Sequence, residues 1–155
     1  MSRDDKRIFD RIQIDDIIRR CRVCRMGLMV DGQPYVVPLC FGYDGKFAYF
    51  HMSRRGKKMA GLNTNRHVCL EWDHPGDVIE SPDPCGWSMS FESVIAYGSV
   101  VFLQSDHEKR AGLNFIMQQY SRKDVKWSFP IEKLEKTVVL KVRLDEISGM
   151  VKRGI

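Results

Sequence analysis

The sequence predicts a mainly β protein, in which six or seven antiparallel strands form a small barrel with flanking helices. Asp-Gly pairs at residues 31–32 and 44–45 separate short runs of β-branched and aromatic residues, which is a strong signal for hairpins. A long run at 87–103 contains Gly98, as expected of a strand that bends or bulges. Few helices are available to cover exposed strand edges, so a closed sheet is favoured over an open one.

The N-terminal part is expected to contribute one short helix. Residues 1–12 are polar for the most part, and we expect them to form a loosely ordered segment. Asp15 or Asp16 then supplies the short acceptor side chain that caps a helix, and Ile17 and Ile18 turn toward the core.

Three strands are expected next, followed by a short helix and a fourth strand. Residues 23–30, 35–43 and 46–51 are predicted to form an antiparallel meander, because an Asp-Gly turn joins each run to the next. Residues 56–63 read as a brief helix, and residues 67–73 return as a strand.

The second half of the chain begins with a loop at 74–86, which holds three of the six prolines, and continues with the long strand at 87–103. Residues 105–108 form a capping box, so a helix is predicted there. Its inward residues at helical spacing are Leu113, Ile116, Met117 and Tyr120. A polar connection at 121–124 leads to the last strand, 137–144, in which apolar residues alternate.

Length and composition favour one domain spanning 1–155. The 155 residues carry a net charge of +5, with 43% hydrophobic and 29% charged residues, as in ordinary globular proteins. There is neither a long apolar run nor a signal pattern, so we expect a cytoplasmic protein without a membrane partner. Basic residues form short clusters rather than a long stripe with interleaved aromatics, which favours local anion sites over nucleic acid.

The five cysteines do not predict a disulfide framework, because their number is odd and no secretion signal is present. Cys21 and Cys24 form a C-x-x-C pair, but no second ligand pair follows at zinc spacing. Two small, partly buried side chains are the better interpretation. The four histidines likewise do not combine with carboxylates at metal-ligand spacing, so no metal site is expected.

Positive charge is concentrated where the third strand ends. Residues 49–58 run from an apolar strand into a hydroxyl, a glycine and four cations, just before the predicted helix. The N–H groups of the helix start and the ammonium groups of Lys57 and Lys58 can converge on one dianion, and a phosphate fits best. The alternative is a solvated basic loop, which we expect for Arg54 and Arg55.

A ligand of more than a few atoms has no room inside so small a barrel, whose interior is filled by side chains. Such a ligand must bind outside the barrel or between two subunits, and a homodimer is therefore expected. Trp72, Trp87 and Trp127 are expected in the core or at the subunit interface, where one of them could cover a ligand by stacking.

This order of elements resembles the nitroimidazole-resistance branch of the pyridoxamine 5'-phosphate oxidase-like, FMN-binding split-barrel superfamily. The matching segments are Pro38-Leu39-Cys40-Phe41-Gly42-Tyr43, Tyr49-Phe50-His51, Gly56-Lys57-Lys58, Cys85-Gly86-Trp87-Ser88, Ser93-Val94-Ile95 with Gly98, and the helix from Glu108 through Met117 to Tyr120. The resemblance covers about Arg22 to Gly149. It implies a split barrel and a homodimer with two flavins in clefts between the subunits.

The resemblance also assigns site residues. The residues that fall where the family holds the flavin and its phosphate are His51, Ser53, Gly56, Lys57 and Lys58. The residues that fall beside the isoalloxazine ring are Val37, Pro38 and Leu39, and Ser93 falls beside the phosphate. On the sequence alone His51 is a structural histidine. The resemblance makes it the candidate catalytic residue, able to deliver a proton to a substrate oxygen.

The function implied is that of an FMN-dependent oxidoreductase, with FAD as the alternative cofactor. A donor such as NAD(P)H passes two electrons to the flavin, which reduces a small planar electron acceptor such as a nitroimidazole through to the amine. Two alternatives stay open. One is oxidation of pyridoxamine phosphate, which the end of the chain at Ile155 soon after the last strand disfavours, and the other is a non-catalytic flavin or haem carrier.

Overall fold

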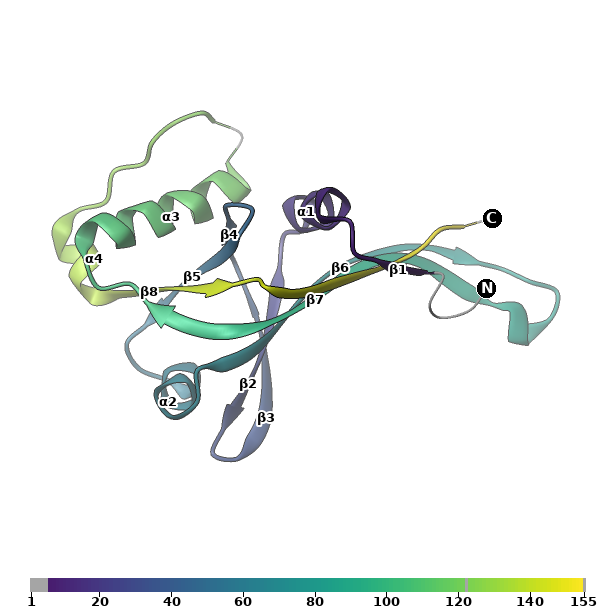
Figure 1. Cartoon of the computed structure of the whole chain (residues 1–155), viewed down its shortest axis with the longest axis horizontal. Coiled ribbons are helices and arrows are strands. Elements are labelled where there is room, and N and C mark those ends of the chain that lie inside the picture. Colours follow the sequence, from purple (N-terminus) through teal and green to yellow (C-terminus); the bar gives the residue numbers. More distant parts are fainter. Residues whose placement is uncertain (1–5, 122, 155) are drawn as a thin grey trace.

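In a computed structural model that describes residues 6–121 and 123–154, nine strands form one antiparallel sheet (Figure 1). The strand order is β3-β2-β6-β7-β8-β5-β4, with β9 paired to β7 and β1 paired to β9. The strands are β1 Arg7–Ile8, β2 Cys24–Val30, β3 Gln33–Leu39, β4 Gly42–Tyr43, β5 Phe47–Ser53, β6 His67–Ile79, β7 Ser88–Phe102, β8 Thr137–Arg143 and β9 Glu146–Lys152. The helices are α1 Arg11–Arg20, α2 Lys57–Thr64, the 3-10 turn η2 Pro84–Gly86, α3 Asp106–Tyr120 and α4 Ile131–Lys136.

Strand β7 connects two halves of this sheet, one formed by β3, β2, β6 and β9 and the other by β8, β5 and β4. Its residues 91–97 pair with β9, whereas residues 100–102 pair with β8. The change of partner falls at Gly98, where a Cβ atom would lie 2.5 Å from the carbonyl oxygen of Arg143 and 2.7 Å from Val142 Cγ1. Gly98, where a bend or bulge was expected, is therefore a point at which the backbones of β7 and β8 lie very close together. The bulge-like shift in register between β6 and β7 lies elsewhere, between Pro75 and Val78.

The first predicted hairpin is confirmed, but the three-strand meander is wrong. Strands β2 and β3 are joined by Asp31 and Gly32, both with positive φ, as a two-residue hairpin turn requires. The predicted strand 35–43 breaks after Leu39, and its last two residues pair with β5 at the other end of the strand order. The break arises because Phe41 is drawn fully into the core and its N–H donates to the Tyr120 hydroxyl at 3.0 Å.

The first helix begins earlier than the sequence suggests. Asp10 caps α1 by accepting a hydrogen bond from the Gln13 N–H at 3.4 Å. Asp15 and Asp16, the expected caps, instead pair with arginines one turn away on the helix surface. Of the segment expected to be loosely ordered, residues 6–12 contain β1 and the start of α1, and residues 1–5 lie outside the described part.

Two further differences concern the second half of the sheet. Strand β6 continues to Ile79, through much of the expected loop, and Pro75 is tolerated because β2 pairs with β6 only at residues 69–71. Strand β9 was not expected, because its serine and glycine interrupt the apolar pattern. With β9, β1 and the separate β4, the described residues contain nine strands rather than six or seven. The segment at 121–124 includes residue 122, which is also outside the described part.

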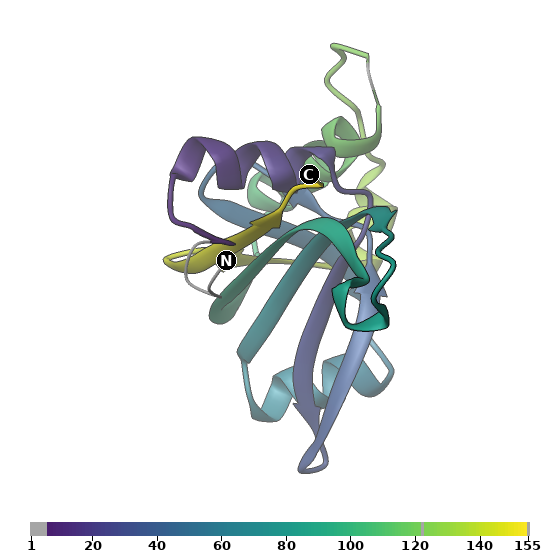
Figure 2. The ribbon, with the colours of Figure 1, turned by 90° about the vertical axis from the view of Figure 1, so that its right-hand side faces the viewer.

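The helices cover different parts of the sheet. Helix α1 lies across the middle, α3 and α4 lie over one end, and the long β6–β7 hairpin projects at the other (Figures 1 and 2). The capping box is confirmed, since Ser105 Oγ accepts the N–H of Glu108 and the Glu108 carboxylate accepts the N–H of Ser105. None of the helices in residues 6–121 and 123–154 combines the length and apolar character needed to cross a bilayer.

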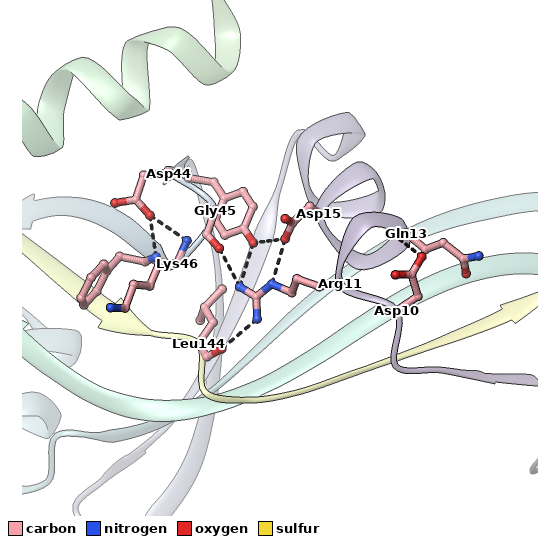
Figure 3. A network of polar contacts seen from close by, with 10 residues as sticks. Asp10, Arg11, Gln13, Asp15, Asp44, Gly45, Lys46 and Leu144 are labelled. Atoms are coloured by element: carbon pink, nitrogen blue, oxygen red, sulfur yellow. Dashed lines mark hydrogen bonds and ion pairs between the residues drawn. The ribbon is translucent and has the colours of Figure 1, made fainter.

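A polar network fastens α1 to the turn between β4 and β5 (Figure 3). The Arg11 guanidinium donates to the carbonyl oxygens of Gly45 at 2.8 Å and Leu144 at 3.1 Å, and to the Tyr43 hydroxyl at 3.1 Å. The Tyr43 hydroxyl in turn donates to Asp15, and burial followed by this bond raises the pKa of Tyr43 to about 12. The network therefore holds β4, the short strand that follows the break after Leu39, against the first helix.

The close approach at Gly98 leads to a stability prediction. Gly98→Ala should lower the free energy of unfolding by about 1–3 kcal/mol, because the new methyl group overlaps the backbone of β8. Gly27→Ala in β2 is the matched control, since its Cβ would meet only ordinary contacts at 3.7 Å. Urea unfolding of the two variants checks this, and equal midpoints would contradict the role given to Gly98.

Candidate functional site

The start of α2 is the part of the cationic segment that is open to a ligand. Gly56 precedes the helix with a φ of 121°, and no side chain caps the first-turn N–H groups. A Cβ atom at Gly56 would meet nothing within 4 Å. By contrast, α1 and α3 are capped by Asp10 and Ser105. The positive end of α2 therefore faces open space, flanked by the ammonium groups of Lys57 and Lys58.

Helix α2 is held rigidly against the sheet. Leu62 is fully buried, and a Cβ atom on Gly61 would lie 2.5 Å from the carbonyl oxygen of Met29 in β2. On the other side, Lys57 Nζ lies 5.8 Å from the centre of the Tyr35 ring in β3. Leu62 and the half-buried Met59 thus form the inward face of this helix. Tyr35 is a neighbour that sequence reasoning missed.

Strands β3 and β5 each present an edge that no described strand covers. Strand β3 pairs only with β2, and β4 covers β5 only at Ala48 and Tyr49. Because Leu39 is three residues from Gly42, the end of β3 lies within about 10 Å of the β4–β5 pair. We call the gap in strand pairing between residues 37–39 of β3 and residues 50–53 of β5 the split.

His51 lies on the β5 side of the split. It pairs with Val139 of β8, and its side chain is exposed while the residues around it are largely buried. Desolvation by the surrounding protein and then the charge of Lys58 lower the pKa of His51 from its ordinary value of 6.5. The imidazole is therefore mainly neutral at pH 7.

The remaining predicted residues divide into two groups. Ser53 is the last residue of β5, and its hydroxyl donates to the Arg55 carbonyl oxygen at 2.8 Å. Val37 and Leu39 pack their side chains against the core, whereas Pro38 faces outward, so β3 offers the split its backbone edge.

Ser93 is not brought to this place within one chain. It pairs with Asp73 in the middle of the sheet, six residues from Ser99, the partner of His67 near the end of α2. At the rise of a β-strand this separation is about 20 Å. The structure thus gathers residues 51–58 and 37–39 around the split and leaves Ser93 apart.

Arg54 is exposed, as expected, but it is also held in place by a neighbouring helix. Its guanidinium donates to the carbonyl oxygen of Glu135 in α4, and it lines a cavity of about 340 Å³ together with Arg66 and Lys109. Neither Arg66 nor Lys109 stands out in the sequence, since one is an isolated cation before β6 and the other lies on a helix. Only the fold brings the three cations together.

The aromatic residues and the cavities put further limits on a site. Trp72 is fully buried and Trp87 lies 53% exposed at the tip of the β6–β7 hairpin. Five cavities at the described surface are lined by residues other than the predicted ones, and the largest, about 690 Å³, lies between Lys6, Ser88 and Lys152. A crevice shared by two subunits would be open on one side in a single chain, so cavity size does not decide the site here.

The outer face of the sheet next to β3 is apolar and uncovered. Side chains exposed by 38% or more on this face are Met29, Val36, Ile95, Tyr97 and Val101. A shallow groove of about 280 Å³ runs between Val36 and Tyr97. Apolar patches of this kind mark interaction surfaces.

Cysteines and acidic residues have structural surroundings. Cys21 and Cys24 are buried free thiols, and burial raises the pKa of Cys21 to about 12, so neither is poised as a thiolate. Arg25 pairs with both Glu71 and Asp73. No group of three or more His, Cys, Asp or Glu that could hold a metal ion occurs in the part of the chain that is described.

Comparison with known proteins places these features in a family. A family model described as pyridoxamine 5'-phosphate oxidase matches residues 10–151. A "putative 5-nitroimidazole antibiotic resistance protein" from Bacteroides thetaiotaomicron is 31% identical, with a TM-score of 0.82 over 92% of this chain and 84% of that chain.

Two further solved structures share the fold at 20% identity. The flavocytochrome Anf3 from Azotobacter vinelandii has a TM-score of 0.88, covering 99% of this chain and 73% of that one. The FAD and heme binding protein from Mycobacterium smegmatis has a TM-score of 0.87, covering 96% and 74%. No curated protein sequence matches the chain.

The surroundings of His51 lead to a titration prediction. NMR titration of the imidazole should give a pKa below 6.5, and Lys58→Gln should raise it, because one of the two causes of the shift is removed. Lys126→Gln, in the loop after α3, is the control and should leave the His51 pKa unchanged. A value at or above 6.5 in the unaltered protein would contradict this description of the site.

Proposed function

Because the chain belongs to the pyridoxamine 5'-phosphate oxidase-like family, we propose that it is an FMN-dependent oxidoreductase with its flavin in the split. The observation that carries the proposal is the uncapped start of α2, where Lys57 and Lys58 stand beside the open edges of β3 and β5. Flavin-binding relatives share the fold, as the names of the flavocytochrome and of the FAD and heme binding protein say.

The residues present fit such a cofactor. A phosphate needs cations and N–H donors with room to approach, and Gly56, Lys57 and Lys58 supply these. The polar rim of a planar ring needs hydrogen-bonding groups at its edge, and the free backbone edge at residues 37–39 supplies them. A bound flavin would provide two-electron redox chemistry, while the protein provides position and protons.

His51 is the candidate proton donor. Since the charge of Lys58 lowers the pKa of His51, a phosphate that pairs with Lys58 would offset this effect and raise the pKa toward neutrality. Phosphate binding and proton availability are thereby coupled. A pKa near the working pH is what general acid catalysis requires.

The proposed reaction is reduction of a small nitroaromatic compound, with NAD(P)H as donor. The relative named for 5-nitroimidazole resistance, at 31% identity over most of both chains, supports this substrate class. A flat acceptor suits a crevice bounded by two strand edges. Reduction in two-electron steps avoids a radical, which is the chemical reason to use a flavin.

A non-catalytic flavin carrier is the second candidate. Several groups are suited to holding a cofactor, namely Lys57, Lys58 and the backbone edge at residues 37–39. Only His51, among the described residues of the split, is a candidate proton donor for catalysis. A carrier would use the same binding residues without turnover. Reduction of a nitroimidazole at the expense of NAD(P)H separates the two functions.

We propose in addition that two copies associate through the outer apolar face. Met29, Val36, Ile95 and Tyr97 come from β2, β3 and β7 on the two sides of β6, and this face adjoins β3 at the split. A second subunit packed there would bury these side chains and close the crevice on its open side.

Flavin binding is the first test. Purified protein incubated with excess FMN should show the yellow flavin absorbance, and Lys58→Gln should weaken FMN binding by about 10-fold, the usual cost of a charged hydrogen bond. Lys126→Gln is the charge-matched control and should bind FMN normally. Protein that stays colourless after incubation with FMN would contradict the proposed function.

The subunit interface gives a separate prediction. Met29→Arg should convert a dimer into a monomer, as measured by light scattering after gel filtration, because it places a charge with no carboxylate opposite it in an apolar contact. Flavin affinity should fall in parallel. Val125→Arg, an exposed apolar position in the loop after α3, is the control. A wild-type protein that is monomeric with FMN bound would exclude the shared crevice.

A further inference from the structure

A second cationic site lies next to the start of α2. The cavity of about 340 Å³ that contains Arg54, Arg66 and Lys109 is bounded by α2, by the end of β7 and by α3. No acidic side chain lines it. Its volume is within the range of small-molecule pockets. Three cations without a carboxylate among the lining residues create a field that attracts an anion.

Two of the three cations are fixed in place by the end of α4. Lys109 Nζ donates to the carbonyl oxygens of Leu134 and Thr137, each at 3.1 Å, and Arg54 donates to the carbonyl oxygen of Glu135. These bonds use only part of the donor capacity of an ammonium or a guanidinium. The side chains are thus pre-oriented and retain donors for a ligand.

Arg66 is the cation most available to an anion. Its guanidinium carbon lies over the Phe102 ring, 4.9 Å from the ring centre, and this cation–π contact positions the group. Among the described residues its side chain takes part in no ion pair or hydrogen bond. A guanidinium that lies over an aromatic ring and keeps its N–H donors free is suited to bidentate contact with phosphate.

The rest of the cavity suits a purine. Phe102, Leu103 and Met59 provide an apolar surface on which a flat ring can pack. Asn63 and Gln104 are exposed carboxamides at its rim that bond to no other described side chain. A carboxamide offers one donor and one acceptor, the pair that the edge of adenine also presents.

We propose that this cavity binds the adenosine-phosphate part of a nucleotide. The identity of the whole nucleotide rests on the proposed function. Two molecules that this function would use carry an adenosine-phosphate part: FAD and the nicotinamide donor. Residues 53–57 connect the cavity directly to the start of α2, so one molecule with two phosphates can reach both anion sites.

The test uses ADP with the full chain. Isothermal titration calorimetry should detect ADP binding, and Arg66→Gln should weaken it by about 10-fold or more through loss of a charged hydrogen bond. Gln104→Glu, which places a carboxylate at the rim, should weaken it as well. Arg55→Gln removes the same charge from the neighbouring loop outside the cavity and should have no effect. Absence of ADP binding, or equal affinity in the Arg66 and Arg55 variants, would overturn the proposal.

Two further measurements identify the source and separate the proposals. If the cavity takes the end of FAD, wild-type protein binds FAD more tightly than FMN, and Arg66→Gln removes the difference while FMN affinity stays unchanged. If it takes the nicotinamide donor, NADPH displaces ADP and FAD has no advantage over FMN. ADP binding without any FMN binding would leave this inference intact and contradict the proposed function.

Discussion

Among the strands in residues 6–121 and 123–154, β7 alone pairs in both halves of the sheet, and its change of partner at Gly98 is the constraint on which the barrel depends. Residues before Gly98 are bonded to β6 and β9, and residues after it are bonded to β8. A side chain at this point would overlap the backbone of β8. The two halves therefore curl toward each other around a residue that only glycine can occupy.

The same curl leaves the barrel incomplete where the candidate site lies. Strands β3 and β4 are consecutive, yet they lie at opposite ends of the strand order because Phe41 enters the core between them. The Tyr120 hydroxyl accepts the N–H of Phe41 and donates to the carbonyl oxygen of Arg22, so α3 holds this crossing in place. The resulting split has backbone groups on both sides, which suits a ligand with a polar edge.

Charge is distributed so that one end of the molecule remains able to bind anions. Arg11, Arg20, Arg25 and Arg143 each pair with a carboxylate. In the described residues no such pair involves Lys57, Lys58 or Arg66, which lie around α2. The positive charges of Lys57, Lys58 and Arg66 are thus not offset by a paired carboxylate among the described residues.

The sequence alone determined the features that rest on local chemistry: the turn at Asp31 and Gly32, the capping box at Ser105 and Glu108, and the cationic segment before α2. Only the tertiary structure decided which strands are neighbours, where the split opens and that Arg54, Arg66 and Lys109 share a cavity. The physical reason is that turns and caps depend on residues within a few positions of each other. Strand order and cavities depend on contacts between distant segments, such as Phe41 with Tyr120, that no local pattern records.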